Sequence, residues 1–123
     1  MRVIAGQAHG RRLKAPRGLN TRPTSARARE SIFSRLAVRM DFAGARVLDV
    51  FAGSGSLGIE SLSRGAAHVT FGDSSRDSAA AIRANLAELG FGARATMLGS
   101  EVRRALAALG AAHESFDLIF VDA

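Results

Sequence analysis

One stretch of the sequence limits the possible folds more than any other, because an apolar segment runs into a glycine-rich turn that opens a helix. The apolar segment is Arg46–Val50, the turn carries Gly53 and Gly55, and Gly58 follows inside the expected helix. Glycines placed in this way let the backbone approach a ligand closely and let the helix pack tightly against the strand. The stretch therefore predicts the first strand and helix of a nucleotide-binding sheet.

Strand and helix patterns alternate along the rest of the chain. The expected strands are Arg46–Val50, His68–Phe71, Ala95–Leu98 and Leu118–Val121, and the expected helices are Leu57–Arg64, Ser75–Leu89 and Glu101–Leu109. Gly65, Gly90 and Gly110 are placed to end the three helices. The unbroken apolar run Leu118–Val121 is typical of a parallel strand that is covered on both faces. This alternation predicts an α/β fold with a doubly wound parallel sheet.

Positive charge is concentrated at the start of the chain. Residues 1–40 hold ten of the 17 Lys and Arg residues and one of the 11 acids. We therefore expect two parts, a basic hairpin with a helix over residues 1–40 and a Rossmann-like cofactor domain over residues 41–123. Short strands at Arg2–Ala5 and Arg11–Lys14 would make the hairpin, and Thr24 or Ser25 would begin a helix that runs to about Arg39.

A segregated basic arm of this kind suits a polyanion, above all nucleic acid. The candidate RNA-binding residues are Arg11, Arg12, Lys14, Arg22 and Arg27. Two interpretations of the hairpin stay open at this point, since it could lie on phosphates or simply cap the domain. For the helix, a solvated charged face is the alternative to phosphate contact.

Composition excludes several classes of protein. Apolar residues make up 47% of the chain, yet no run of 18 apolar residues is present, so we expect no membrane span. No early apolar stretch resembles a signal peptide, and a cytoplasmic location is the simplest interpretation. The chain has no cysteine, and His9, His68 and His113 lack metal-ligand spacing, so neither a disulfide framework nor a metal site is expected.

Two acids decide between the cofactors that such a sheet can bind. Asp73 follows the second strand, where a carboxylate can accept both hydroxyls of a ribose. Asp49 lies near the end of the first strand, four residues before Gly53. An acid there disfavours the pyrophosphate of a nicotinamide dinucleotide and suits the sulfonium and ammonium groups of S-adenosylmethionine. The alternatives are a helix-capping role for Asp49 and an NAD-type oxidoreductase for the chain, while Phe51 by itself is more typical of a core residue.

Several stretches together resemble the bacterial 16S ribosomal RNA guanine-N2 methyltransferases of the RsmD type. The resemblance covers essentially the whole chain, and its most specific pieces are a Thr-Arg-Pro-Thr run and a Phe-Ala-Gly-Ser-Gly loop followed by a helix with a glutamate. The stretches that carry the resemblance are Arg2–Gly6, Gly10–Leu13, Thr21–Thr24, Arg29–Phe33, Leu48–Glu60 and Leu62–Ala66.

The resemblance implies a class I methyltransferase that uses S-adenosylmethionine to methylate N2 of a flipped guanine in 16S ribosomal RNA of a small-subunit particle, as a monomer. It implies that one set of residues lines the amino-acid end of the cofactor, namely Asp49, Phe51, Ala52, Gly53, Ser54, Gly55 and Leu57. By the same resemblance Asp73 holds the ribose, Ser100 or Glu101 contacts the adenine amine, and Asp122 is the catalytic acid that accepts a hydrogen bond from the guanine amine.

The last residues depart from the family pattern. The family's motif is Asp-Pro-Pro followed by an aromatic residue, whereas this chain has Asp122 and Ala123 at that place, and its sheet has about four strands where the family has seven. We therefore expect a partial methyltransferase domain with weak cofactor binding, little methyl transfer and possible self-association. A catalytically inactive fragment that binds RNA or cofactor is the alternative to an active enzyme.

Overall fold

The computed structural model of the protein describes residues 1–16, 25–98, 102–111 and 114–121. Its strands are β1 (Arg46–Val50), β2 (His68–Gly72), β3 (Ala95–Leu98) and β4 (Leu118–Val121). They form one parallel sheet in the order β3-β2-β1-β4, with Asp49 of β1 between Phe71 of β2 and Phe120 of β4. The predicted parallel sheet is confirmed, and so is the placing of the fourth strand beside the first.

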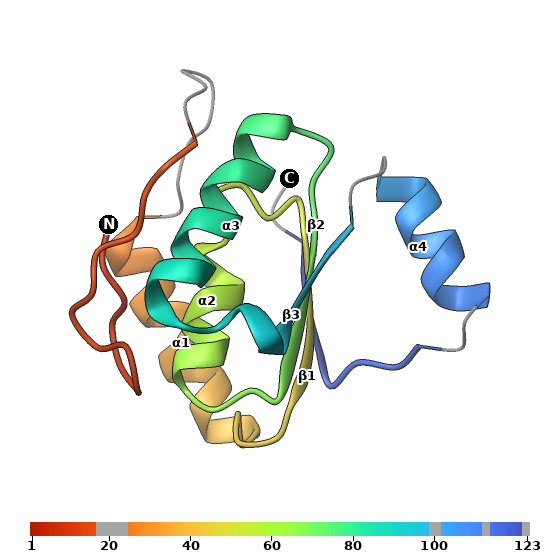
Figure 1. The fold of residues 1–123 in the computed structure, drawn as a ribbon. Helices are drawn as coiled ribbons and strands as arrows, with labels where there is room; N and C mark the ends of the chain where they lie inside the picture. The colour runs from red at the N-terminus through yellow and green to blue at the C-terminus, as the bar shows by residue number, and fades with distance from the viewer. Residues whose placement is uncertain (17–24, 99–101, 112–113, 122–123) are drawn as a thin grey trace.

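Helices cover both faces of this sheet (Figure 1). The helices α1 (Ala26–Arg39), α2 (Ser56–Ser63) and α3 (Arg76–Leu89) lie on one face, and α4 (Val102–Ala111) lies on the other. This arrangement confirms the doubly wound α/β class. A 3-10 turn over Gly92–Arg94, which the sequence did not predict, leads into β3. None of the described helices is both long and apolar enough to cross a membrane.

One predicted helix end was wrong. The helix α4 continues through Gly110 to Ala111, although Gly110 was expected to stop it. Gly65 and Gly90 do follow α2 and α3 with left-handed backbone, at φ values of 113° and 74°, but Gly110 is not in that region. A glycine inside a helix costs only about 1 kcal/mol relative to alanine, so its presence alone does not end a helix.

The N-terminal hairpin differs from the expected pair of strands. One antiparallel bridge, between Arg2 and Arg12, joins its two arms, together with three backbone hydrogen bonds that include one from Leu13 to Met1. The backbone N–H groups of Ile4 and Ala5 donate to the side chain of Glu60 on α2, at 2.8 and 3.1 Å. The hairpin is therefore held both by its own backbone bonds and by contacts with α2.

The core lies between the sheet and the helices α1, α2 and α3. Residues from both ends of the chain meet there, since the ring of Phe33 on α1 lies 5.4 Å from that of Phe42 and 5.7 Å from that of Phe120 on β4. Val3 and Leu13 of the N-terminal segment join the same cluster. The division of the chain near residue 40 stays a prediction.

The strand β4 corrects a second expectation. Its run of apolar residues was expected to be covered on both faces, but Ile119 and Val121 are 52% and 67% exposed. Phe120, which points to the face with α1, is buried. Within the described ranges β4 is thus covered on one face only. An unbroken apolar run does not by itself distinguish these two cases.

Candidate functional site

The glycine-rich turn after β1 lies at the carboxyl edge of the sheet. Ala52 donates its N–H to the carbonyl oxygen of Gly72 at the end of β2, at 3.1 Å. Gly55 donates to the carbonyl oxygen of Ala52 at 2.8 Å and receives the N–H of Ile59, which begins the hydrogen bonding of α2. The turn therefore ties two neighbouring strand ends to one helix N-terminus, the usual place for ligands in such sheets. We call residues 51–55 the cofactor loop.

Asp73 closes one side of this loop. Its Oδ2 accepts the N–H of Gly53 at 3.0 Å, and its Oδ1 accepts the N–H of Ser75 at 2.9 Å. The side chain is half-buried, so the carboxylate is held in place while part of it faces outward. Each carboxylate oxygen can accept more than one hydrogen bond. Asp73 thus has acceptor capacity left at the position predicted for a ribose.

Asp49 lies on the inner side of the loop and is 1% exposed. Its Oδ2 accepts the N–H of Gly58 in the first turn of α2, at 3.1 Å. This contact agrees with the helix-capping alternative considered for Asp49. It does not exclude the cofactor role, because a carboxylate fixed at a helix N-terminus also supplies negative charge beside the loop.

Phe51 corrects the simpler interpretation of an aromatic residue next to the loop. Its side chain is 42% exposed and its backbone is left-handed, with φ 59°. Among the described residues it is the one non-glycine with positive φ. Such a conformation is strained for a bulky residue and persists where the surrounding structure imposes it, often at functional sites. Phe51 is therefore not a core residue.

The rest of the loop and the start of α2 are packed closely. A Cβ added to Gly58 would come within 2.3 Å of a ring carbon of Phe71, so only glycine fits this helix against β2. Leu57 is 5% exposed and belongs to the core cluster. Ser54 is also buried, and its Oγ lies 3.7 Å from the sulfur of Met1. The cofactor-binding roles expected of Leu57 and Ser54 stay predictions. Because both side chains are buried, their backbone atoms would have to make the contacts with the cofactor.

Sequence reasoning missed a buried ionic cluster that holds the N-terminal segment on α2. Glu60 is fully buried and lies 3.7 Å from Arg29 of α1 and 3.0 Å from Arg64. The guanidinium of Arg29 also donates to the carbonyl oxygen of Arg2 at 2.9 Å. Burial lowers the pKa of Arg29, and the nearby Glu60 opposes that effect. The sequence did carry a signal, because Arg29 lies four residues before Phe33, on the apolar face of the helix.

A second missed residue, Asn85 of α3, is 1% exposed. Its Oδ1 accepts the N–H of Lys14 at 2.7 Å, and its Nδ2 donates to the carbonyl oxygen of Lys14 at 3.0 Å and of Ser54 at 3.3 Å. The signal in the sequence is a polar residue close to Ile82 and Leu86 on the buried side of α3. Asn85 joins the N-terminal segment to the cofactor loop.

The predicted RNA-binding residues that the structure describes are exposed. Arg11, Arg12 and Lys14 lie on the returning arm of the hairpin, and Arg27 lies in the first turn of α1. Arg11 donates to the carbonyl oxygen of Glu88 on α3 at 3.3 Å, so this arm crosses the helix that follows Asp73. We call residues 11–14 the basic segment. Arg22, Ser100, Glu101 and Asp122 lie outside the described residues.

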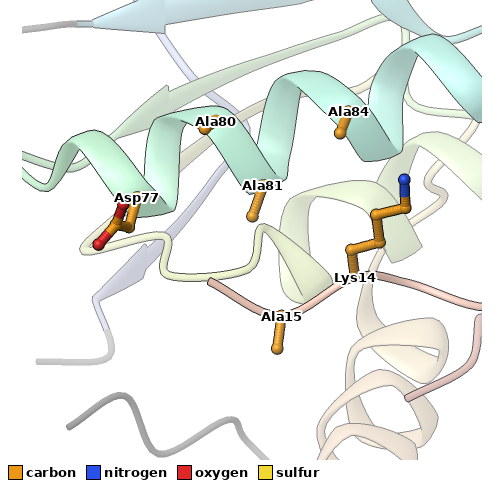
Figure 2. A pocket seen from close by; sticks show the side chains of 6 residues that line it. All are labelled: Lys14, Ala15, Asp77, Ala80, Ala81 and Ala84. Carbon is orange, nitrogen blue, oxygen red and sulfur yellow. The ribbon is translucent and has the colours of Figure 1, made fainter. Parts of the chain in front are cut away.

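A small hollow separates the end of this arm from α3 (Figure 2). It has a volume of about 200 Å³. Figure 2 shows Lys14 and Ala15 passing along the helix opposite the short side chains of three alanines, with Asp77 at one end of the hollow. The lining residues are Lys14, Ala15, Asp77, Ala80, Ala81 and Ala84. Beyond Lys14 the chain is therefore loosely packed against α3.

No group of three or more His, Cys, Asp or Glu residues that could hold a metal ion is present in the described ranges. His68 at the start of β2 instead shares a hydrogen bond of 2.7 Å with Thr96 of the neighbouring β3.

Comparison with known proteins identifies relatives along the full chain. A family model described as "Conserved hypothetical protein 95" matches residues 1–123. The chain is 42% identical over 123 residues to ribosomal RNA small subunit methyltransferase D of Escherichia coli K12, in a match that covers 99% of this chain and 59% of that protein. The chain spans 59–65% of the length of the first curated relatives it matches.

Solved structures agree with this relationship. A hypothetical protein of Thermus thermophilus is 30% identical with a TM-score of 0.87, over 98% of this chain and 67% of that one. A more distant structure, SMU.776, was solved in complex with SAH and is 19% identical with a TM-score of 0.65, over 76% of this chain and 25% of that one. The second likeness shows the shared fold.

Proposed function

The chain belongs to the conserved hypothetical protein 95 family, which includes ribosomal RNA small subunit methyltransferase D, and we propose that it binds S-adenosylmethionine and methylates N2 of a guanine in 16S ribosomal RNA. The observation that carries the proposal is the joining of Asp73 to the cofactor loop through the N–H of Gly53. This contact brings a ribose-binding acid and a loop flanked by Asp49 to one edge of the sheet.

The residues at this edge fit S-adenosylmethionine better than a dinucleotide. Asp49 lies beside the loop, where a carboxylate disfavours a pyrophosphate, while Asp73 can hold the ribose of either cofactor. The sulfonium and ammonium groups of S-adenosylmethionine are cations, which Asp49 stabilises. The neighbour of the same fold that was solved with SAH supports this choice, because SAH is the product left after methyl transfer.

The bound cofactor supplies a methyl group on a sulfonium, which is a good leaving group. The residues of this chain then have to align the acceptor nitrogen with that methyl group, and orientation of this kind can lower a barrier by about 7–11 kcal/mol. In the proposal Asp73 holds the ribose and the backbone of the cofactor loop holds the amino-acid end. Phe51, whose side chain is 42% exposed, belongs to the same loop and is proposed to contact the cofactor.

The acceptor amine of guanine is a weak nucleophile because its lone pair is delocalised into the ring. In the proposal Asp122, which follows β4, accepts a hydrogen bond from that amine and favours loss of its proton as the new bond forms. A guanine stacked within a helix cannot reach the cofactor, so the base must be flipped or already unpaired. The basic segment holds the surrounding phosphates.

The test is transfer of radiolabelled methyl groups from S-adenosylmethionine to small-subunit particles that lack the modification, followed by digestion and separation of the nucleosides. We expect the label in N2-methylguanosine. Label in another base would contradict the assignment of the acceptor. If S-adenosylhomocysteine and the particles both bind but no label is transferred, the chain is instead an RNA- and cofactor-binding fragment, the alternative that the sequence left open.

A further inference from the structure

The three hydrogen bonds of Asn85 join two regions to which the proposed function assigns different ligands. Lys14 belongs to the basic segment, which is proposed to hold RNA, and Ser54 belongs to the cofactor loop. Asn85 itself is 71 residues from Lys14 and 31 from Ser54 in the sequence. One buried amide on α3 therefore has the backbone of both regions as its partners.

The amide of Asn85 uses both of its polar atoms in these bonds. Its Oδ1 accepts the N–H of Lys14 and its Nδ2 donates to the carbonyl oxygen of Lys14, which is the bonding pattern of a neighbouring strand. The Nδ2 also donates to the carbonyl oxygen of Ser54. Asn85 is 1% exposed, so water cannot replace a lost partner without rearrangement. A movement of Lys14 therefore displaces the amide that bonds to Ser54.

Packing does little to fix the chain just beyond this point. The hollow of about 200 Å³ separates Lys14 and Ala15 from the alanines of α3 (Figure 2). Leu13 is buried in the core, so the bonds to Asn85 fix the Lys14 backbone at the point where core packing ends. The same helix begins at Arg76, three residues after Asp73, whose Oδ1 accepts the N–H of the capping residue Ser75. The proposed ribose acid therefore lies just before the N-terminus of α3, and the anchor of the basic segment lies about three turns farther along.

We propose that Asn85 is a positioning residue that couples RNA binding by the basic segment to cofactor binding by the loop. The inference rests on the proposed function and names a regulation of the same site. Coupling between two ligands is reciprocal, so the cofactor product must strengthen RNA binding by the same factor by which RNA strengthens binding of the product.

The experiment measures both ligands alone and together. Dissociation constants are determined for S-adenosylhomocysteine and for unmodified small-subunit particles, each with and without a saturating amount of the other. The variants are Asn85→Ala and the matched control Ser78→Ala, which alters another buried polar residue of α3, about two turns nearer its start. We expect about a fivefold or larger coupling factor in the unaltered protein and in Ser78→Ala, and less than about twofold in Asn85→Ala.

A second measurement needs no variant. Hydrogen exchange of the Lys14 amide, which donates to Asn85, should slow when S-adenosylhomocysteine binds, whereas the Leu13 amide, which donates to the carbonyl oxygen of Met1, should change little. This measurement decides the question if Asn85→Ala does not fold.

The outcomes separate the two proposals. If S-adenosylhomocysteine or the particles fail to bind on their own, the proposed function fails and the coupling fails with it. If both bind but neither alters the affinity of the other, the coupling alone is overturned. The same holds if Asn85→Ala keeps the full coupling factor, or if exchange at Lys14 is unaffected by the bound product.

Discussion

The Oδ2 atom of Asp73 accepts the N–H of Gly53 at 3.0 Å, which joins the end of β2 to the glycine-rich loop that follows β1. Both groups lie at the carboxyl edge of the sheet, so one carboxylate orders the loop and faces the space beside it. This relationship underlies the proposed cofactor site and the first prediction.

Replacing Asp73 with alanine should weaken binding of S-adenosylhomocysteine by about 1.5–3 kcal/mol, as expected when hydrogen bonds to a charged group are lost. Asp77→Ala is the matched control, because Asp77 is an exposed acid only four residues away, in the first turn of α3. Titration calorimetry gives both affinities. Equal weakening in the two variants would contradict the assignment of Asp73.

Replacing Arg11, Arg12 and Lys14 together with alanine should make RNA binding less dependent on salt. Each phosphate contact contributes about 0.7–0.9 to the slope of log affinity against log salt, so three lost contacts should reduce it by about two to three. Arg104→Ala removes an exposed cation from α4 on the other face of the sheet and should leave the slope nearly unchanged. An unaltered slope in the triple variant would indicate that the hairpin caps the domain and does not contact phosphates.

The buried ionic cluster predicts a large difference between two glutamates. Glu60→Gln breaks a pair in which both side chains are at most 1% exposed, and this should cost about 3–5 kcal/mol of unfolding free energy. Glu114→Gln breaks an exposed pair with Arg46 and should cost at most about 1 kcal/mol. Urea denaturation measures both. Similar losses would show that Glu60 does not anchor the N-terminal segment.

Two glycines of the hairpin, Gly6 and Gly10, have nearly equal φ angles of 83° and 80° but different surroundings. A Cβ at Gly6 would lie 1.9 Å from the carbonyl oxygen of Ser63, whereas a Cβ at Gly10 would meet nothing within 4 Å. Gly10→Ala should therefore cost only the left-handed strain, about 1–2 kcal/mol. Gly6→Ala should cost about 1–3 kcal/mol more, because the backbone of α2 must give way. Thermal unfolding with equal shifts in the two variants would argue against close docking of the hairpin.

The sheet could be predicted from the sequence because its strands are short apolar runs separated by helices, two of which are followed by a glycine with left-handed backbone. Three of the four strands have the predicted bounds, and β2 is longer by Gly72 alone. The loop and Asp73 were also predictable, since their spacing is set within one strand, helix and strand unit. These features depend on contacts that are local or between adjacent elements.

The contacts of the hairpin with Glu60 and Asn85 could not be predicted from the sequence in the same way. Glu60 bonds to Ile4 and Ala5 across 56 and 55 residues, and Asn85 bonds to Lys14 across 71. Nothing in local periodicity predicts which distant backbone a buried polar side chain will satisfy. The polar residues on the apolar faces of α1 and α3 indicated that partners must exist, but not where they lie.

The central claim is that the edge formed by the cofactor loop and Asp73 binds S-adenosylmethionine rather than a dinucleotide. Titration calorimetry of the protein with S-adenosylhomocysteine and, separately, with NAD tests it most directly. The account predicts saturable binding of S-adenosylhomocysteine that is lost or weakened in Asp73→Ala, and no saturable binding of NAD. Saturable binding of NAD that S-adenosylhomocysteine does not displace would contradict it.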